Sequence, residues 1–192
     1  MKKDLIVELL ERSETVWSVS QIAQIMPEIK IGSLHDKLIY YVGVGKLQRL
    51  RRGIYAKRKF NPYELANKLY APSYVSLESV LVKEGIVFQY YETIFLIASV
   101  TRDVQVGEVK ILYRYMKPEI LTNLTGIQQI NGYSEATRER AWLDAVYLYR
   151  DYHFDHLDVI DWDKVWEIMP IYGSKIFEKR VKKYHQTYLE ER

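Results

Sequence analysis

Apolar residues between positions 3 and 42 repeat at helical spacing in three segments. Residues 3–12 predict an amphipathic helix, residues 21–26 a second helix capped by Ser20, and residues 32–42 a third. A β-prone segment at 15–19 separates the first two helices. The apolar side of the third segment is formed by Ile31, Leu34, Leu38 and Val42. Its opposite side carries Ser33, Asp36, Lys37 and Tyr40.

A basic β-hairpin is predicted next, over residues 46–56. Leu47 and Leu50 flank basic residues, and Gly53 marks a turn or bulge before the returning strand. Three short helices followed by a basic hairpin is the order of a winged helix-turn-helix domain, which we place at residues 1–62.

Helical and β-prone segments continue over residues 63–192, the second predicted domain. Helices are predicted at 64–70, 76–84, 137–149, 162–169 and 174–189, and strands at 93–100 and 109–115. A hairpin over 126–133 turns at Asn131-Gly132. Ser76, Thr137 and Asp161 are placed to cap helices. The expected fold class is therefore α+β, an N-terminal winged helix-turn-helix followed by a mixed α/β domain.

Charge is distributed unevenly along the 192 residues, whose formal net charge is +3. Residues 1–63 carry a net charge of +6, whereas residues 64–192 carry −3. Eight basic residues and no acidic residue lie between Asp36 and Glu64. Such an offset predicts that the first third of the chain meets a polyanion, and double-stranded DNA is the partner that suits the predicted fold.

The candidate DNA-binding residues belong to the third helix and to the basic segment that follows it. Groove contacts are predicted for Ser33, Lys37 and Tyr40. Phosphate or adjacent-groove contacts are predicted for Lys46, Arg49, Arg51, Arg52, Lys57, Arg58 and Lys59. Two alternatives stay open: a solvated basic surface, and a winged helix that contacts a protein partner.

Catalysis is not predicted, and neither a cofactor nor a metal is expected. The chain has no cysteine, and its histidines are scattered, with His35 expected at the core edge of the third helix. Residues 153–163 concentrate metal-type ligands, but their spacing is typical of a polar turn. Gly173-Ser174 resembles a nucleotidyltransferase pair, yet the closely spaced carboxylates that would hold magnesium do not follow it. The tyrosines lie in periodic elements, which favours packing over a stacking surface for single-stranded nucleic acid.

Apolar runs are too short for a membrane span and acidic residues interrupt the first segment, so we expect a cytoplasmic protein without membrane contact. The C-terminal helix places Phe177, Val181, Tyr184 and Tyr188 on one stripe.

Three segments resemble the AbiEi-type antitoxins of type IV toxin–antitoxin systems. They are residues 45–55, residues 72–81 with Gly85-Ile86 following, and residues 136–144. Arg138 stands where the family pattern has proline, and Trp142 where it has a small aliphatic residue. The resemblance covers residues 15–150 and does not extend into 151–192.

The resemblance implies a winged-helix DNA-binding domain followed by an antitoxin domain. It implies a repressor of its own promoter that counteracts a nucleotidyltransferase-like toxin, without necessarily forming a tight complex with it. The alternative is a non-catalytic protein-interaction module. Within the second domain, Asp144 lies on a mostly apolar helix and is expected to be a buried, paired carboxylate rather than a partner contact.

Overall fold

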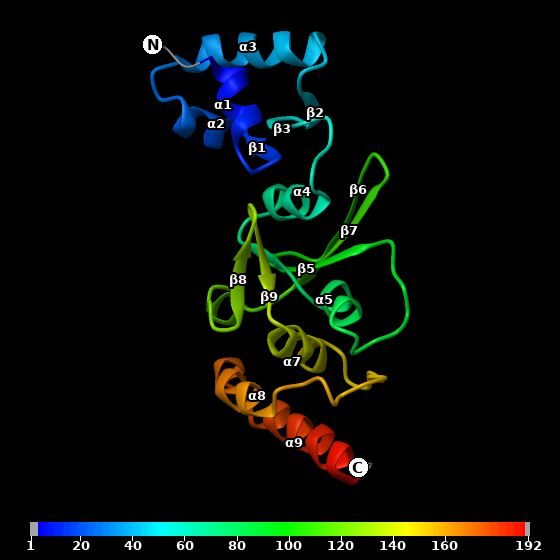
Figure 1. Cartoon of the computed structure of the whole chain (residues 1–192). Helices are drawn as coiled ribbons and strands as arrows, with labels where there is room; N and C mark the ends of the chain where they lie inside the picture. Colours follow the sequence, from blue (N-terminus) through cyan, green and yellow to red (C-terminus); the bar gives the residue numbers. More distant parts are fainter. Residues whose placement is uncertain (1–3, 191–192) are drawn as a thin grey trace.

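The computed structural model of the chain describes residues 4–190, which form an α+β fold of helices and two β-sheets. The elements are stacked along one direction (Figure 1). Helices α1 to α3 and the smaller sheet occupy one end, and α4 separates them from the larger sheet. Helices α7, α8 and α9 follow at the other end, so the two predicted regions lie end to end.

The first unit contains every element predicted for it: α1 (Leu5–Glu11), β1 (Val16–Ser18), α2 (Val19–Ile25), α3 (Ile31–Gly43), β2 (Gln48–Arg51) and β3 (Ile54–Ala56). Its sheet is antiparallel, in the order β1-β3-β2. Leu9, Ile22, Leu34 and Leu38 are completely buried in its core. The predicted cap of α2 is wrong by two residues, because Ser18 and Gln21 form a capping box in place of Ser20.

The inward side of α3 is narrower than predicted. Leu34, Leu38 and Tyr41 are buried, whereas Ile31 is 57% exposed and His35 is exposed as well. At 100° per residue, Ile31 and His35 lie beyond the edge of the side that Leu34, Leu38 and Tyr41 define. Ile31 is therefore not a core residue, and His35 does not lie at the core edge.

The second unit is built on a six-stranded sheet in the order β6-β7-β5-β4-β9-β8. Its strands are β4 (Ser73–Val75), β5 (Ile94–Ala98), β6 (Arg102–Val106), β7 (Val109–Tyr115), β8 (Ile127–Ile130) and β9 (Tyr133–Ala136). The pairs β4–β9 and β5–β7 are parallel and the others antiparallel. The β8–β9 turn confirms the predicted hairpin, since Asn131 and Gly132 both adopt positive φ. Edge strand β6 was not predicted, because its half-exposed sequence is mostly polar.

The helices of the second unit are α4 (Pro62–Leu69), α5 (Glu78–Lys83), α6 (Pro118–Leu121), α7 (Arg138–Leu148), α8 (Trp162–Ile168), the 3₁₀ turn η1 (Met169–Tyr172) and α9 (Lys175–Glu190). Thr137 and Asp161 cap α7 and α8 as predicted. Ser76 does not cap α5, which begins at Glu78. Across residues 4–190, no helix combines the length and apolar character needed to span a membrane.

Helix α7 is the centre of the second core. Every residue from 139 to 146 is buried, because the sheet lies on one side of α7 and helices α8 and α9 lie on the other. Trp142 packs against the rings of Phe154, Trp162 and Tyr184. The aromatic residues around α7 thus serve packing, as the sequence predicted.

One buried carboxylate joins the two units. Glu64 of α4 is 1% exposed and accepts hydrogen bonds from Thr15 N at 2.8 Å, Thr15 Oγ1 at 2.9 Å and Val16 N at 3.0 Å. Its side chain also lies directly beneath Gly132, where a Cβ atom would come within 3.0 Å of it. Helix α4 therefore holds β1 of the first unit and the β8–β9 hairpin of the second.

Candidate nucleic-acid interface

Helix α3 is fixed to α1 through Asp4. Tyr41 Oη donates to Asp4 Oδ1 at 2.8 Å, and the same oxygen caps α1 by accepting from Ile6 N at 3.1 Å. The hydrogen bond from Tyr41 holds the pKa of Asp4 below its usual value. Burial, together with the bond to Asp4, raises the pKa of Tyr41 to about 12. With Leu34 and Leu38 buried beneath it, α3 presents one fixed face to the interior.

The other face of α3 is open to solvent along the outer edge of the molecule (Figure 1). Ser33, Lys37 and Tyr40, the three predicted groove residues, are all exposed. Tyr40 is 63% exposed, and its ring meets the edge of Tyr41. A fixed helix with an accessible polar face is the geometry that a DNA major groove accepts.

The predicted basic hairpin is formed by β2 and β3, and the side chains of β2 alternate between half-buried and exposed. Leu50 faces the interior, while Arg49, Arg51 and Arg52 are exposed. The register shifts between Arg49 and Arg51, and Gly53 takes the positive φ of 78° that the turn requires. Lys46 and Lys59 are also exposed.

Arg51 lies beside Tyr70, which directly follows α4. A hydrogen bond from Arg102 Nη1 at 2.9 Å lowers the pKa of Tyr70, and Arg51 contributes to the same shift. Arg51 and Arg102 therefore both lie close to the hydroxyl of Tyr70, the residue that follows α4.

Two residues of the predicted phosphate track have roles within the fold. Lys57 Nζ donates to the carbonyl oxygens of Leu10 at 3.1 Å and Arg12 at 2.6 Å, and it lies 5.8 Å from the ring centre of Trp17. Lys57 therefore ties β3 to the end of α1, which does not fit the predicted phosphate contact. Arg58 donates through Nε to the carbonyl of Gly45 but remains exposed.

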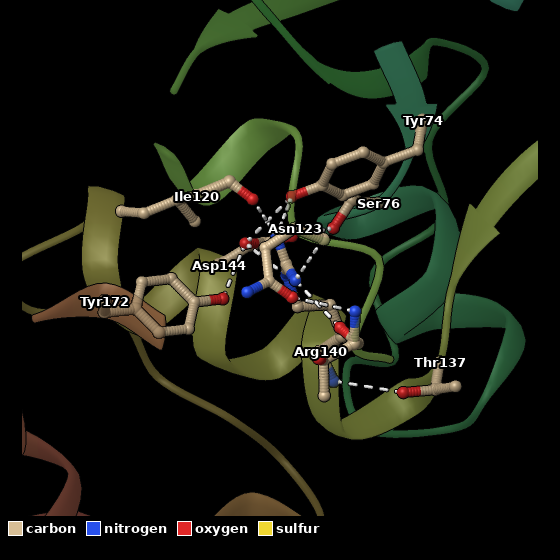
Figure 2. Close-up of polar contacts among 9 residues, drawn as sticks. Tyr74, Ser76, Ile120, Asn123, Thr137, Arg140, Asp144 and Tyr172 are labelled. Carbon is tan, nitrogen blue, oxygen red and sulfur yellow. Dashed lines mark hydrogen bonds and ion pairs between the residues drawn. The ribbon is translucent and has the colours of Figure 1, made fainter. Parts of the chain in front are cut away.

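Residues 72–81 and 136–144 of the second unit meet in a buried polar network (Figure 2). Tyr74 and Ser76 come from residues 72–81, and Arg140 and Asp144 from residues 136–144. Asp144 accepts from Ser76 Oγ at 2.8 Å, from Arg140 Nε at 3.3 Å, and from Tyr172 Oη at 2.7 Å. Arg140 and Asp144 are both completely buried. The prediction that Asp144 is a buried, paired carboxylate is confirmed.

Arg140 satisfies the rest of its donors within the same network. Nη1 donates to the carbonyls of Asn123 and Thr125, and Nη2 donates to Tyr74 Oη and the carbonyl of Ile120. Complete burial raises the pKa of Asp144, and Arg140 with the hydroxyl donors opposes that shift. The arginine thus ties the segment before β8 to α7, and the network anchors these parts of the fold to one another.

Among residues 4–190, no three His, Cys, Asp or Glu side chains converge on a metal position. His153 and His156 each lie beside a different carboxylate, Asp155 at 3.7 Å and Asp158 at 3.5 Å.

A hollow of about 410 Å³ beside α5 contains Glu78, whose pKa is raised by burial. Its neighbour Ser79 accepts from Phe95 N, and Lys83 is paired with Glu135 at 2.6 Å. Ser79 and Lys83, two of the polar residues that line this hollow, are therefore engaged in fold contacts.

Searches of known protein-family models and of curated protein sequences found no match to this chain.

Sequence reasoning missed three features of the candidate interface. The link between Tyr41 and Asp4 joins residues 37 positions apart, which no local pattern reveals. The structural role of Lys57 is hidden because its partners are backbone carbonyls. Ile39, 64% exposed on α3, could have been found by noting that it lies outside the arc of Leu34 and Leu38.

Proposed function

We propose that this chain is a non-catalytic, DNA-binding transcriptional repressor whose first unit is a winged helix-turn-helix domain. The observation that carries the proposal is α3, which is fixed on one side by Leu34, Leu38 and Tyr41 and exposed along the other. The hairpin of exposed arginines follows it directly in the chain. In this arrangement α3 enters the major groove and the basic residues around it contact phosphates.

Binding of the purified protein to the DNA upstream of its own gene, titrated against salt, tests the proposal. We expect a preference for the native over a scrambled duplex of about 1,000-fold, within the range of specific regulators. Replacing Arg49 and Arg52 with Ala should reduce the salt slope by about 0.9 for each phosphate that the variant no longer neutralises. Lys179→Ala with Lys182→Ala, on α9 at the opposite end of the molecule, is the matched control. Equal affinity for both duplexes would refute sequence-specific repression.

The antitoxin role rests on the resemblance of residues 72–81 and 136–144 to AbiEi-type antitoxins. That these two segments meet in one network supports their assignment to a single unit. In this proposal the second unit counteracts a nucleotidyltransferase-like toxin encoded beside the repressor. Co-expression of residues 63–192, the full chain, or neither with the neighbouring gene tests it, with growth as the measurement. Growth arrest that the full chain fails to relieve would remove the antitoxin role.

A protein-interaction module is the second candidate, and an exposed aromatic segment favours it. Phe88 and Tyr90 are 69% and 79% exposed between α5 and β5. Phe88 N is held by Asp155 at 2.9 Å, so the segment presents its rings from a fixed backbone. Double replacement of Phe88 and Tyr90 with Ala should leave DNA binding unchanged in the repressor proposal. A loss of toxin relief with DNA binding intact would assign this surface to a protein partner.

A further inference from the structure

The exposed side of α3 has two flanks that differ in chemistry. Helical spacing places Ser33, Lys37, Tyr40 and Val44 along one flank. The other flank carries Ile31, His35 and Ile39. Ile31 and Ile39 are 57% and 64% exposed, so this flank offers two branched aliphatic side chains to whatever α3 meets.

The side chains of α3 limit what the helix can read in a major groove. The sequence of Ile31–Gly43 contains no Arg, Asn or Gln, the residues that make bidentate contacts with guanine or adenine. Lys37 is its one lysine, and Asp36 can only accept hydrogen bonds. Besides the exposed polar residues Ser33, His35 and Tyr40, the helix exposes the aliphatic side chains of Ile31 and Ile39. The apolar group that they can contact in the major groove is the 5-methyl of thymine.

Two glycines let the backbone of α3 approach a partner closely. Gly32 and Gly43 lie between the two flanks, and a Cβ atom at either position would meet nothing within 4 Å. Neither residue adopts positive φ, so nothing inside the fold requires glycine there. Alanine stabilises a helix more than glycine does, so the two glycines cost stability that the fold itself does not require. Their lack of side chains would let the backbone of α3 come close to an external surface.

We infer that the flank of α3 formed by Ile31, His35 and Ile39 recognises thymine methyl groups in the DNA, with Ile39 as the residue that determines this specificity. The inference rests on the proposed function, since it assigns the chemistry that the DNA-binding helix reads. Burying one methyl group against an aliphatic side chain corresponds to roughly a four-fold change in Kd. Two contacted thymines would therefore account for about a sixteen-fold preference.

The test begins with selection of bound duplexes from a random-sequence pool by the full chain. In the selected duplex each thymine is then replaced by uracil, which removes the methyl group and keeps the base pairing. We expect at least one position where uracil raises Kd about four-fold for the wild type. At that position Ile39→Ala should bind thymine and uracil duplexes within two-fold of each other.

Two variants serve as controls. Ile176→Ala removes an aliphatic side chain that is 75% exposed on α9, at the far end of the molecule, and should keep the full uracil effect. Lys37→Ala should raise the Kd of the thymine and uracil duplexes by the same factor, because the contact of a lysine with a phosphate does not depend on the methyl group of the base. Circular dichroism of each variant confirms that its helices are intact.

The outcomes separate the inference from the function on which it rests. A selected duplex that is insensitive to uracil at every position, or equally sensitive with Ile39→Ala, overturns thymine recognition and leaves DNA binding standing. Failure to select any duplex overturns both. Self-association of the free protein that Ile39→Ala abolishes would assign this flank of α3 to a second copy and overturn the inference as well.

Discussion

Replacing Asp144 with Ala should destabilise the protein far more than breaking an exposed ion pair of the same helical spacing. Arg140 and Asp144 are an i, i+4 pair with 3.3 Å between Nε and Oδ1, and both side chains are completely buried. Glu178 and Lys182 on α9 form the same spacing at a shorter 2.6 Å, but both are substantially exposed. Burial rather than distance decides which pair matters, because a buried partner left alone cannot be solvated.

The magnitude follows from what Asp144→Ala leaves behind. Arg140 would keep its charge in the core, and the hydroxyls of Ser76 and Tyr172 would each be left without this acceptor. Removing one partner of a buried pair costs about 3–5 kcal/mol, whereas an exposed i, i+4 pair contributes about 0.3–0.5 kcal/mol. At an m-value of about 2 kcal/mol/M, the expected shift of the urea midpoint is about 2 M.

Urea denaturation followed by tryptophan fluorescence measures this difference, with Glu178→Ala as the matched control. Trp142 lies on the same helix as the pair and reports the second core. Asp144→Asn preserves shape and should still cost at least about 1.5 kcal/mol, which keeps the test available if the alanine variant does not fold. The double variant Arg140→Met, Asp144→Leu should be more stable than either single truncation. If Asp144→Ala and Glu178→Ala differ by less than about 1 kcal/mol, the network does not anchor the fold.

Three further predictions concern the first unit and its junction. Gly32→Ala should raise the free energy of unfolding by up to about 0.5 kcal/mol yet weaken DNA binding, and unchanged affinity would show that α3 does not approach DNA closely. Because the folded-state pKa of Asp4 is lowered, its stabilising contribution is present above the unfolded pKa of about 3.9 and is lost as pH falls through the folded value. Asp4→Asn should flatten stability against pH in that acidic window, and thermal melts of wild type and variant from pH 2 to 6 measure it. Glu64→Ala should cost about 3 kcal/mol and separate the unfolding of the two cores, whereas a single unchanged transition by calorimetry would contradict its role as their link.

Local patterns were sufficient to predict most elements of the fold. The Asn131-Gly132 turn, the caps at Thr137 and Asp161, and the three helices of the first unit depend on neighbouring residues and were located correctly. Strand β6 was missed because an edge strand needs only one partner and buries little, so its sequence can stay polar. Ser76 was misassigned because a serine before a helical pattern suits a cap, while its true partner lies 68 residues away.

The candidate interface was predictable in composition but not in arrangement. Exposure of Ser33, Lys37 and Tyr40 follows from the helical period alone. Whether a basic side chain faces solvent or the backbone depends on tertiary contacts, which is why the sequence does not show that Lys57 donates to backbone carbonyls. The net charge of a segment indicates whether it attracts a polyanion. It does not show whether a given lysine or arginine faces solvent or donates to the backbone.

The position of Glu64 argues that the two units act as one body. The boundary predicted at residue 62 separates the clusters of apolar residues well, but the backbone N–H groups of Thr15 and Val16 find their acceptor on the far side of it. Val16, Ile54 and Ala56 likewise pack into the second core. A buried donor without an acceptor costs about 1–3 kcal/mol, so residues 1–62 alone would carry that cost at β1. Helix α4 thus holds β1 of the unit that carries the proposed DNA-binding helix. Through Gly132 the same helix contacts the hairpin that leads into α7 and its buried arginine.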